Sequence, residues 1–248
     1  MLHFNVNYTS FLEYINTPSI TEADDIYLLK AVTSWLEEVK DSKESDKREE
    51  TIRHIVTFIA DPNKDELSFG GLNLTKFPPI FPMRLPTSCC KLANQFTQKL
   101  KTLYLANTEV TTLPDCIGNL PSLTSLYIYE NKLTCLPDSI GDLANLTLLN
   151  LSNNELTTLP DSLRNLTALN ELDLSSNQLA TLPKCIKNLS ELRKLYLGDN
   201  KLAQLPNGIL SLPKLEECDI VNDRAGWNWS PGEKRSDLDV NDPRDLGA

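Results

Sequence analysis

The stretch "LTLLNLSNNELTTLPDSLRNLTA", Leu146–Ala168, decides the fold, because it fills seven fixed slots with leucine and places Asn154 and Pro160 at fixed positions between them. The arrangement recurs every 23 residues, in copies that start at Leu100, Leu123, Leu146, Leu169 and Leu192, with a partial copy from Leu215. In the five full copies all seven slots hold Leu, Ile or Val. Such a period predicts a repeat architecture in which neighbouring copies share one continuous core.

The first half of each copy has the alternation of a β-strand. In "LNELDLS", Leu172 and Leu174 point to one side, while Glu171, Asp173 and Ser175 point to the other. Stacked copies would place these short strands in parallel, each pairing with its neighbours. The leucines would then form the core.

The second half of each copy must return the chain on the opposite side of the stack. In "LPDSLRNL" we expect a tight turn or a short helix, with Pro160 fixing one backbone angle. In four of the five full copies an asparagine follows the strand where the chain turns inward, and its amide can both donate and accept for buried backbone. We interpret these residues as structural: Asn131, Asn154, Asn177 and Asn200, with Thr108 in the same slot of the first copy.

The motif L-x-x-L-x-L-x-x-N-x-L, followed by x-x-L-P-x-x-I/L-x-x-L, resembles the leucine-rich repeat in its 23-residue variety. The resemblance runs from Leu100 to about Ile220. It implies an α/β repeat fold, a curved solenoid with a parallel sheet on its concave side. A degenerate earlier copy, "LSFGGLNLTKFPPI" from Leu67, is followed by an insertion of about a dozen residues.

The ends of the stack need covers for their apolar faces. Upstream, two amphipathic helical patterns predict an N-terminal helical cap, the second pattern ending near Pro62. Downstream, Trp227 and Trp229 either cover the last rung or form an exposed docking pair. The expected organisation is a cap over 1–63, an irregular first repeat with its insertion over 64–99, the solenoid over 100–229 and a flexible tail over 230–248.

Helices leading into a first repeat, as in Arg48–Ile80, "REETIRHIVTFIADPNKDELSFGGLNLTKFPPI", resemble bacterial effectors delivered into host cells. The best-known of these end in a ubiquitin-ligase domain with a catalytic cysteine. Only about thirty residues follow the start of the last copy, so we expect that domain to be absent.

Composition limits the kinds of partner that the protein is expected to bind and the compartment in which it is expected to act. A formal net charge of -10 disfavours nucleic acid and anionic membrane surfaces. The N-terminus lacks a Sec-type signal, and no apolar stretch reaches the roughly 18 residues of a membrane span. The six cysteines form no paired framework, which favours reduced thiols in a cytosolic compartment. An effector would be secreted into the host cell.

The strand residues that face away from the core would line the concave face. Tyrosines concentrate toward one end of it and acids toward the other, which suits a protein partner with a basic edge. The alternative is that these residues are merely tolerated on a strand surface. The candidate partner-binding residues are Tyr104, Tyr127, Tyr129, Asn150, Glu171, Asp173, Lys194, Tyr196, Glu217 and Asp219.

The sequence offers no motif for catalysis. It contains no nucleophile beside a base, no glycine-rich phosphate loop, and no HExxH or CxxC spacing, so we expect no enzyme, cofactor or metal. The predicted function is that of a monomeric, non-enzymatic protein-binding module, acting as a bacterial effector on a host protein. The alternatives are a substrate-recruiting adaptor or truncated ubiquitin ligase, and a surface or extracellular repeat protein.

Overall fold

The computed structural model describes the central repeats and parts of their N-terminal neighbour, namely residues 47, 50, 51, 54, 55, 57, 58, 61, 63–72, 74, 97–203, 209 and 212–220. The first predicted helix, the inserted segment around residue 85, Trp227 with Trp229, and the tail over 230–248 lie outside these residues.

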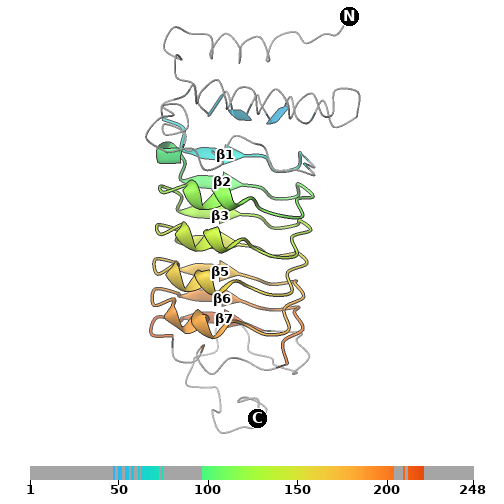
Figure 1. Cartoon of the computed structure of the whole chain (residues 1–248), viewed down its shortest axis with the longest axis vertical. Coiled ribbons are helices and arrows are strands. Elements are labelled where there is room, and N and C mark those ends of the chain that lie inside the picture. The colour runs from blue at the N-terminus through green and yellow to red at the C-terminus, as the bar shows by residue number, and fades with distance from the viewer. Residues whose placement is uncertain are drawn as a thin grey trace, which may run out of the picture.

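In the part of the chain that the structure describes, seven short parallel strands pair in chain order and form one curved, unclosed sheet (Figure 1). They are β1 Glu66–Ser68, β2 Thr102–Tyr104, β3 Ser125–Tyr127, β4 Leu148–Asn150, β5 Glu171–Asp173, β6 Lys194–Tyr196 and β7 Glu217–Asp219. The predicted parallel pairing is therefore confirmed.

The strand register follows the sequence period. Thr102 pairs with Ser125, 23 residues further along, and every later strand keeps this interval. Glu66 pairs with Thr102, so the first interval is 13 residues longer than the others. The residues of each strand therefore form columns that run straight across the sheet.

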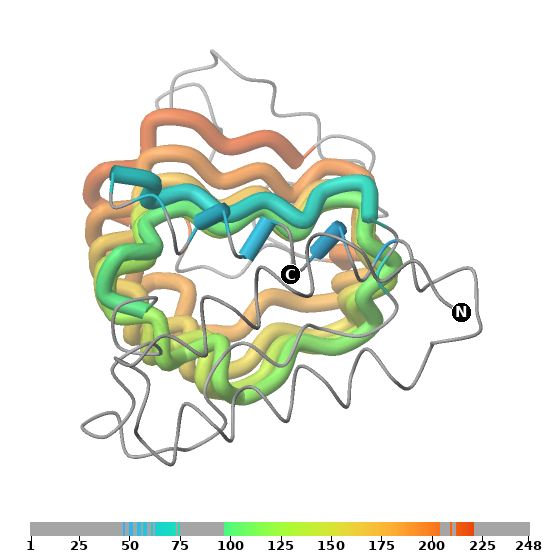
Figure 2. The backbone as a smooth tube through the Cα atoms, turned by 90° about the horizontal axis from the view of Figure 1, so that it is seen from above, coloured from blue at the N-terminus to red at the C-terminus, as the bar shows by residue number. Residues whose placement is uncertain are grey.

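Among the elements that the structure describes, four 3-10 helices lie in the returning halves, on the side of the coil opposite the sheet. Figure 2 shows this coil from above. The four helices are η1 Asp115–Asn119, η2 Asp138–Asp142, η3 Asp161–Asn165 and η4 Lys184–Asn188. A proline precedes each helix with φ between -66° and -74°, the range that its ring imposes. The sequence predicted either a tight turn or a short helix in the second half of each copy, and the structure has a short helix in these four copies.

Leucine fills the space between the sheet and the 3-10 helices. The central residue of every strand is buried, and Leu172, for example, is fully buried between Leu149 and Leu195 of the adjacent strands. Cys218 takes the same slot in β7 and is also buried. One apolar core therefore runs continuously from rung to rung.

The turns after β1 to β6 use a left-handed backbone. The residue before the asparagine slot has φ between 52° and 57° in five successive rungs, at Asn107, Glu130, Asn153, Ser176 and Asp199. Residues other than glycine adopt this conformation rarely, and asparagine and aspartate tolerate it best. In the first rung the corresponding residue is Gly71, with φ of 74°.

Helical residues N-terminal to β1 contact the solenoid. Ile55 and Phe58 are buried in the same core as the repeats. The ammonium group of Lys99 donates to the carbonyl oxygens of Phe58, at 2.5 Å, and Asp61, and lies 4.4 Å from the centre of the Phe58 ring. The part of the predicted second helix that the structure describes is thus joined to the first rungs.

Candidate protein-binding surface

The first and third residues of each strand point away from the core and form what we call the sheet face. The middle strand residue is buried, whereas its two neighbours are partly or fully accessible to solvent in all seven strands. The leucine slots therefore leave the identities of the sheet-face residues free for another purpose. Nine of the ten candidate residues lie on this face, and Tyr129 lies two residues beyond it in the same direction.

Tyrosine side chains gather at the N-terminal end of the sheet face. Tyr104 and Tyr127 occupy adjacent strands in register, with ring centres 4.6 Å apart and ring planes 7° from parallel. Burial of its ring and the neighbouring Tyr104 raise the pKa of Tyr127. Tyr129 extends this group past the end of β3, and Leu148 on β4 adds an accessible apolar side chain. We call these four residues the aromatic patch.

Carboxylates gather at the other end of the sheet face. Asp173 and Asp219 flank Tyr196 in the column of third strand residues, and Glu171 and Glu217 flank Lys194 in the column of first residues. Burial, followed by the charge of Glu217, raises the pKa of Tyr196 to about 12. We call these six residues the acidic patch.

Within the acidic patch, one of the carboxylates faces a cation of the same chain. Lys194 Nζ lies 3.8 Å from a carboxylate oxygen of Glu171, and both side chains are substantially exposed. Such a pair contributes little to stability because water and salt screen it. Four carboxylates against one ammonium group leave this end of the sheet face strongly negative.

Two of the candidate residues also hold their own turns. Asp173 Oδ1 accepts hydrogen bonds from the backbone N–H of Ser175, at 3.0 Å, and from its hydroxyl, at 2.6 Å. Asn150 makes the same pair of bonds with Ser152, at 3.0 and 2.8 Å. These two side chains are therefore fixed in orientation, each with one terminal oxygen or nitrogen left for other contacts.

The four asparagines predicted to be structural lie buried between the rungs. The Asn154 amide nitrogen donates to the carbonyl oxygens of Leu151 and Ser152 in its own rung, and to that of Ile128 in the rung before. Its oxygen accepts from the backbone N–H of Leu133, at 3.0 Å. Asn131, Asn177 and Asn200 repeat this pattern.

Thr108 serves the same turn in the first regular rung by other means. Its hydroxyl oxygen lies 2.9 Å from both the Leu105 carbonyl oxygen and Asn131 Oδ1, so its proton can be donated to either. Its backbone N–H donates to Asn131 Oδ1, at 3.1 Å. The side chain is fully buried. Sequence reasoning marked Thr108 only as a departure from the repeat.

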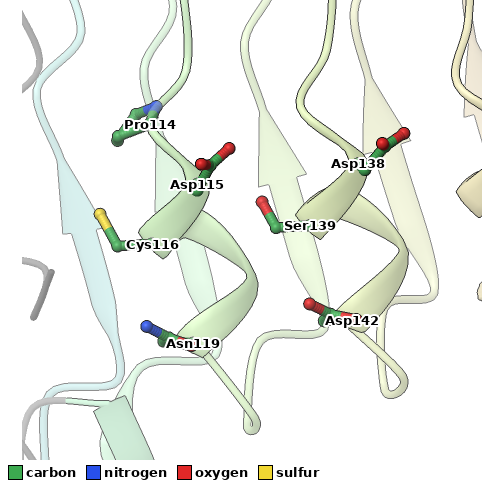
Figure 3. A pocket seen from close by; sticks show the side chains of 7 residues that line it. All are labelled: Pro114, Asp115, Cys116, Asn119, Asp138, Ser139 and Asp142. Atoms are coloured by element: carbon green, nitrogen blue, oxygen red, sulfur yellow. The ribbon is translucent and has the colours of Figure 1, made fainter. Parts of the chain in front are cut away.

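A depression between η1 and η2, on the side of the coil opposite the sheet, was not anticipated from the sequence (Figure 3). Burial raises the pKa of the Cys116 thiol in its wall to about 11, so the thiol stays protonated at neutral pH and is a poor nucleophile. The other lining residues are Pro114, Asp115, Asn119, Asp138, Ser139 and Asp142.

The described residues lack the features that a metal site or a membrane span requires. In that part of the chain no three His, Cys, Asp or Glu side chains are grouped so as to hold a metal ion. None of its helices combines the length and the apolar character that crossing a bilayer requires. Cys116, Cys135, Cys185 and Cys218 are free thiols.

The family follows from the repeats just described. The family model for a leucine-rich repeat region matches residues 88–177 and 139–228, which together span more than half of the chain. The chain belongs to the leucine-rich repeat family. This fold suggests a protein–protein interaction module. No protein of curated function matches the chain in sequence.

Several solved structures are similar. YopM from Yersinia enterocolitica is 29% identical with a TM-score of 0.60, and the match covers 80% of this chain and 37% of YopM. A leucine-rich repeat protein of Leptospira interrogans is 27% identical with a TM-score of 0.43, covering 68% of this chain and 58% of that one. An internalin, InlF, of Listeria monocytogenes is 28% identical with a TM-score of 0.44, covering 52% and 37%. The chain thus spans between 37% and 58% of the length of these three proteins.

Proposed function

We propose that the chain is a non-enzymatic binding module that holds a partner protein on its sheet face. The observation that carries this proposal is the separation of that face into an aromatic patch and an acidic patch. Neither patch is needed to build the core, because the buried slots belong to the alternate residues of each strand. Tyrosines are enriched where interface energy concentrates, and a negative field favours a partner with a basic edge.

We further propose that the module works as a bacterial effector inside a host cell. The helical residues that pack on the first rungs suit the effector-like order of helices and repeats in the sequence. The similarity to YopM, at a TM-score of 0.60, is compatible with this role. In this proposal residues 1–63 form the cap, residues 64–99 the irregular first repeat, residues 100–229 the solenoid with its C-terminal cover, and residues 230–248 a flexible tail.

Affinity capture from a eukaryotic lysate tests the proposal. The protein is used whole, as wild type, as the double variant Tyr127→Ala and Tyr129→Ala, and as Asp173→Lys. Loss of captured protein in these variants, with circular dichroism and denaturation midpoints near those of the wild type, is the expected result. The aromatic change should remove contact area, whereas the charge reversal should act on encounter and on salt dependence.

The matched controls lie on the opposite side of the coil. Asp138→Lys and Arg164→Glu reverse exposed charges in η2 and η3. Capture should survive both changes. If these two variants abolish capture while the sheet-face variants retain it, the binding face is on the helical side and the proposal is wrong.

A further inference from the structure

We propose that the sheet face binds an extended peptide segment that runs across the strands, with an aromatic or large aliphatic residue on the aromatic patch and an arginine or lysine on the acidic patch. This inference rests on the proposed function and adds the chemistry and spacing of the bound segment. The columns that cross the sheet supply both anchors in register, so a straight segment meets them in turn.

The cationic end of the segment follows from the surroundings of Tyr196. Its ring lies between the in-register carboxylates of Asp173 and Asp219. A guanidinium or ammonium group over an aromatic ring is attracted to the ring face, and neighbouring carboxylates accept its hydrogen bonds. Electrostatic complementarity thus selects a basic side chain at this position.

The apolar end follows from the Tyr104 and Tyr127 stack. The two rings stack on each other across β2 and β3, and the partly exposed Leu148 on β4 lies diagonally from Tyr127, in register with Ser125. A flat aromatic or aliphatic side chain can bury area there at a small entropic cost, since the two rings already hold each other in place.

The distance between the patches sets the spacing in the segment. Tyr127 lies on β3, Asp173 on β5 and Tyr196 on β6. At about 4.8 Å between adjacent strands, these positions lie about 10 and about 14 Å from the tyrosine stack. An extended chain advances about 3.3 Å per residue, so the basic residue should stand about three or four positions from the apolar one, in either chain direction.

The probe is a phage-displayed library of random dodecapeptides, selected on the full chain, followed by fluorescence polarisation with the consensus peptide made synthetically. The expected result is enrichment of one apolar and one basic residue at the stated spacing, with affinity that falls as salt is raised. A selection without that spacing, or without basic residues, overturns the inference.

The second measurement compares the affinity of the consensus peptide for three single-residue variants. Asp173→Asn should weaken the consensus peptide by about two- to fivefold, the range of an exposed ion pair. The change should keep the turn intact, because Asn150 makes the same two hydrogen bonds one rung earlier. Lys194→Ala should tighten binding, because it removes the cation beside Glu171, whereas Arg164→Ala should have no effect. Unchanged affinity in both Asp173→Asn and Lys194→Ala contradicts the inference.

These outcomes separate the inference from the proposed function. If the sheet-face variants abolish lysate capture but the selected peptides lack the stated pattern, the assignment of the binding face holds. The proposal of an extended segment with a basic residue is then wrong. If lysate capture is indifferent to the sheet face, the proposed function fails, and this inference fails with it.

Discussion

Replacing Asn131 or Asn154 by alanine should destabilise the solenoid by different amounts, although the two residues occupy the same slot of the repeat. In Asn154→Ala the carbonyl oxygens of Ile128, Leu151 and Ser152 each keep a second donor: the amide of Asn131, the amide of Asn177 and the backbone N–H of Glu130. The backbone N–H of Leu133, whose described partner is Asn154 Oδ1, loses it.

Asn131→Ala leaves two buried backbone donors without that partner. The N–H groups of Thr108 and Val110 both donate to Asn131 Oδ1, at 3.1 and 3.0 Å. A buried polar group left unsatisfied costs about 1–3 kcal/mol. We therefore expect about 2 kcal/mol for Asn154→Ala and about 4 kcal/mol for Asn131→Ala.

Urea denaturation followed by far-ultraviolet circular dichroism measures both free energies of unfolding, provided that the slope with denaturant stays constant. Asn145→Ala is the matched control, because that amide is exposed and makes one described bond, to the Pro121 carbonyl oxygen. Its effect should stay within about 0.5 kcal/mol. A loss for Asn131→Ala equal to or smaller than that for Asn154→Ala would refute the reasoning from orphaned donors.

Three further predictions concern packing and reactivity. Leu172→Ala should lower the free energy of unfolding by about 2–5 kcal/mol, because it empties a fully buried slot between two rungs; an unchanged urea midpoint contradicts the register. Gly141→Ala should destabilise by about 1–3 kcal/mol, because a Cβ there would lie 2.4 Å from the Ser162 carbonyl oxygen; the melting temperature checks it. With iodoacetamide at pH 8, peptide mass spectrometry should find the exposed Cys135 modified before the buried Cys218, whose pKa burial raises. Equal rates would indicate that the last strand opens under native conditions.

The repeat period was sufficient to predict the parallel sheet and its register. A side chain alternates with a period of two along a strand, so fixing the leucines fixes which residues face outward. The prediction could not extend to the left-handed turn residues, because Glu130 and Ser176 carry no local signal for positive φ. The surrounding rungs impose that conformation.

Less of the candidate surface than of the fold could be predicted from the sequence. The sequence placed Tyr104 and Tyr127 in adjacent rungs, but the near-parallel stacking of their rings depends on rotamers set by both strands. Likewise, the pairing of Asp173 with Ser175 is a local side-chain choice that competes with outward contacts. The residues were identifiable from the period, whereas their orientations and remaining hydrogen-bonding capacity required coordinates.

The unbroken 23-residue register has a consequence for how recognition by this surface can change. Removing residues 146–168 would delete β4 and η3 together and leave β3 beside β5, with every leucine and asparagine contact re-formed across the junction. The distance from Tyr127 to Asp173 would then fall from about 10 to about 5 Å, one strand interval. A substitution changes the side chain that a partner contacts at one position of the sheet face. Gain or loss of a repeat changes the distance between two such positions. The identity of the sheet-face side chains and the distance between them can therefore vary independently in this chain. The distance changes only by whole strand intervals.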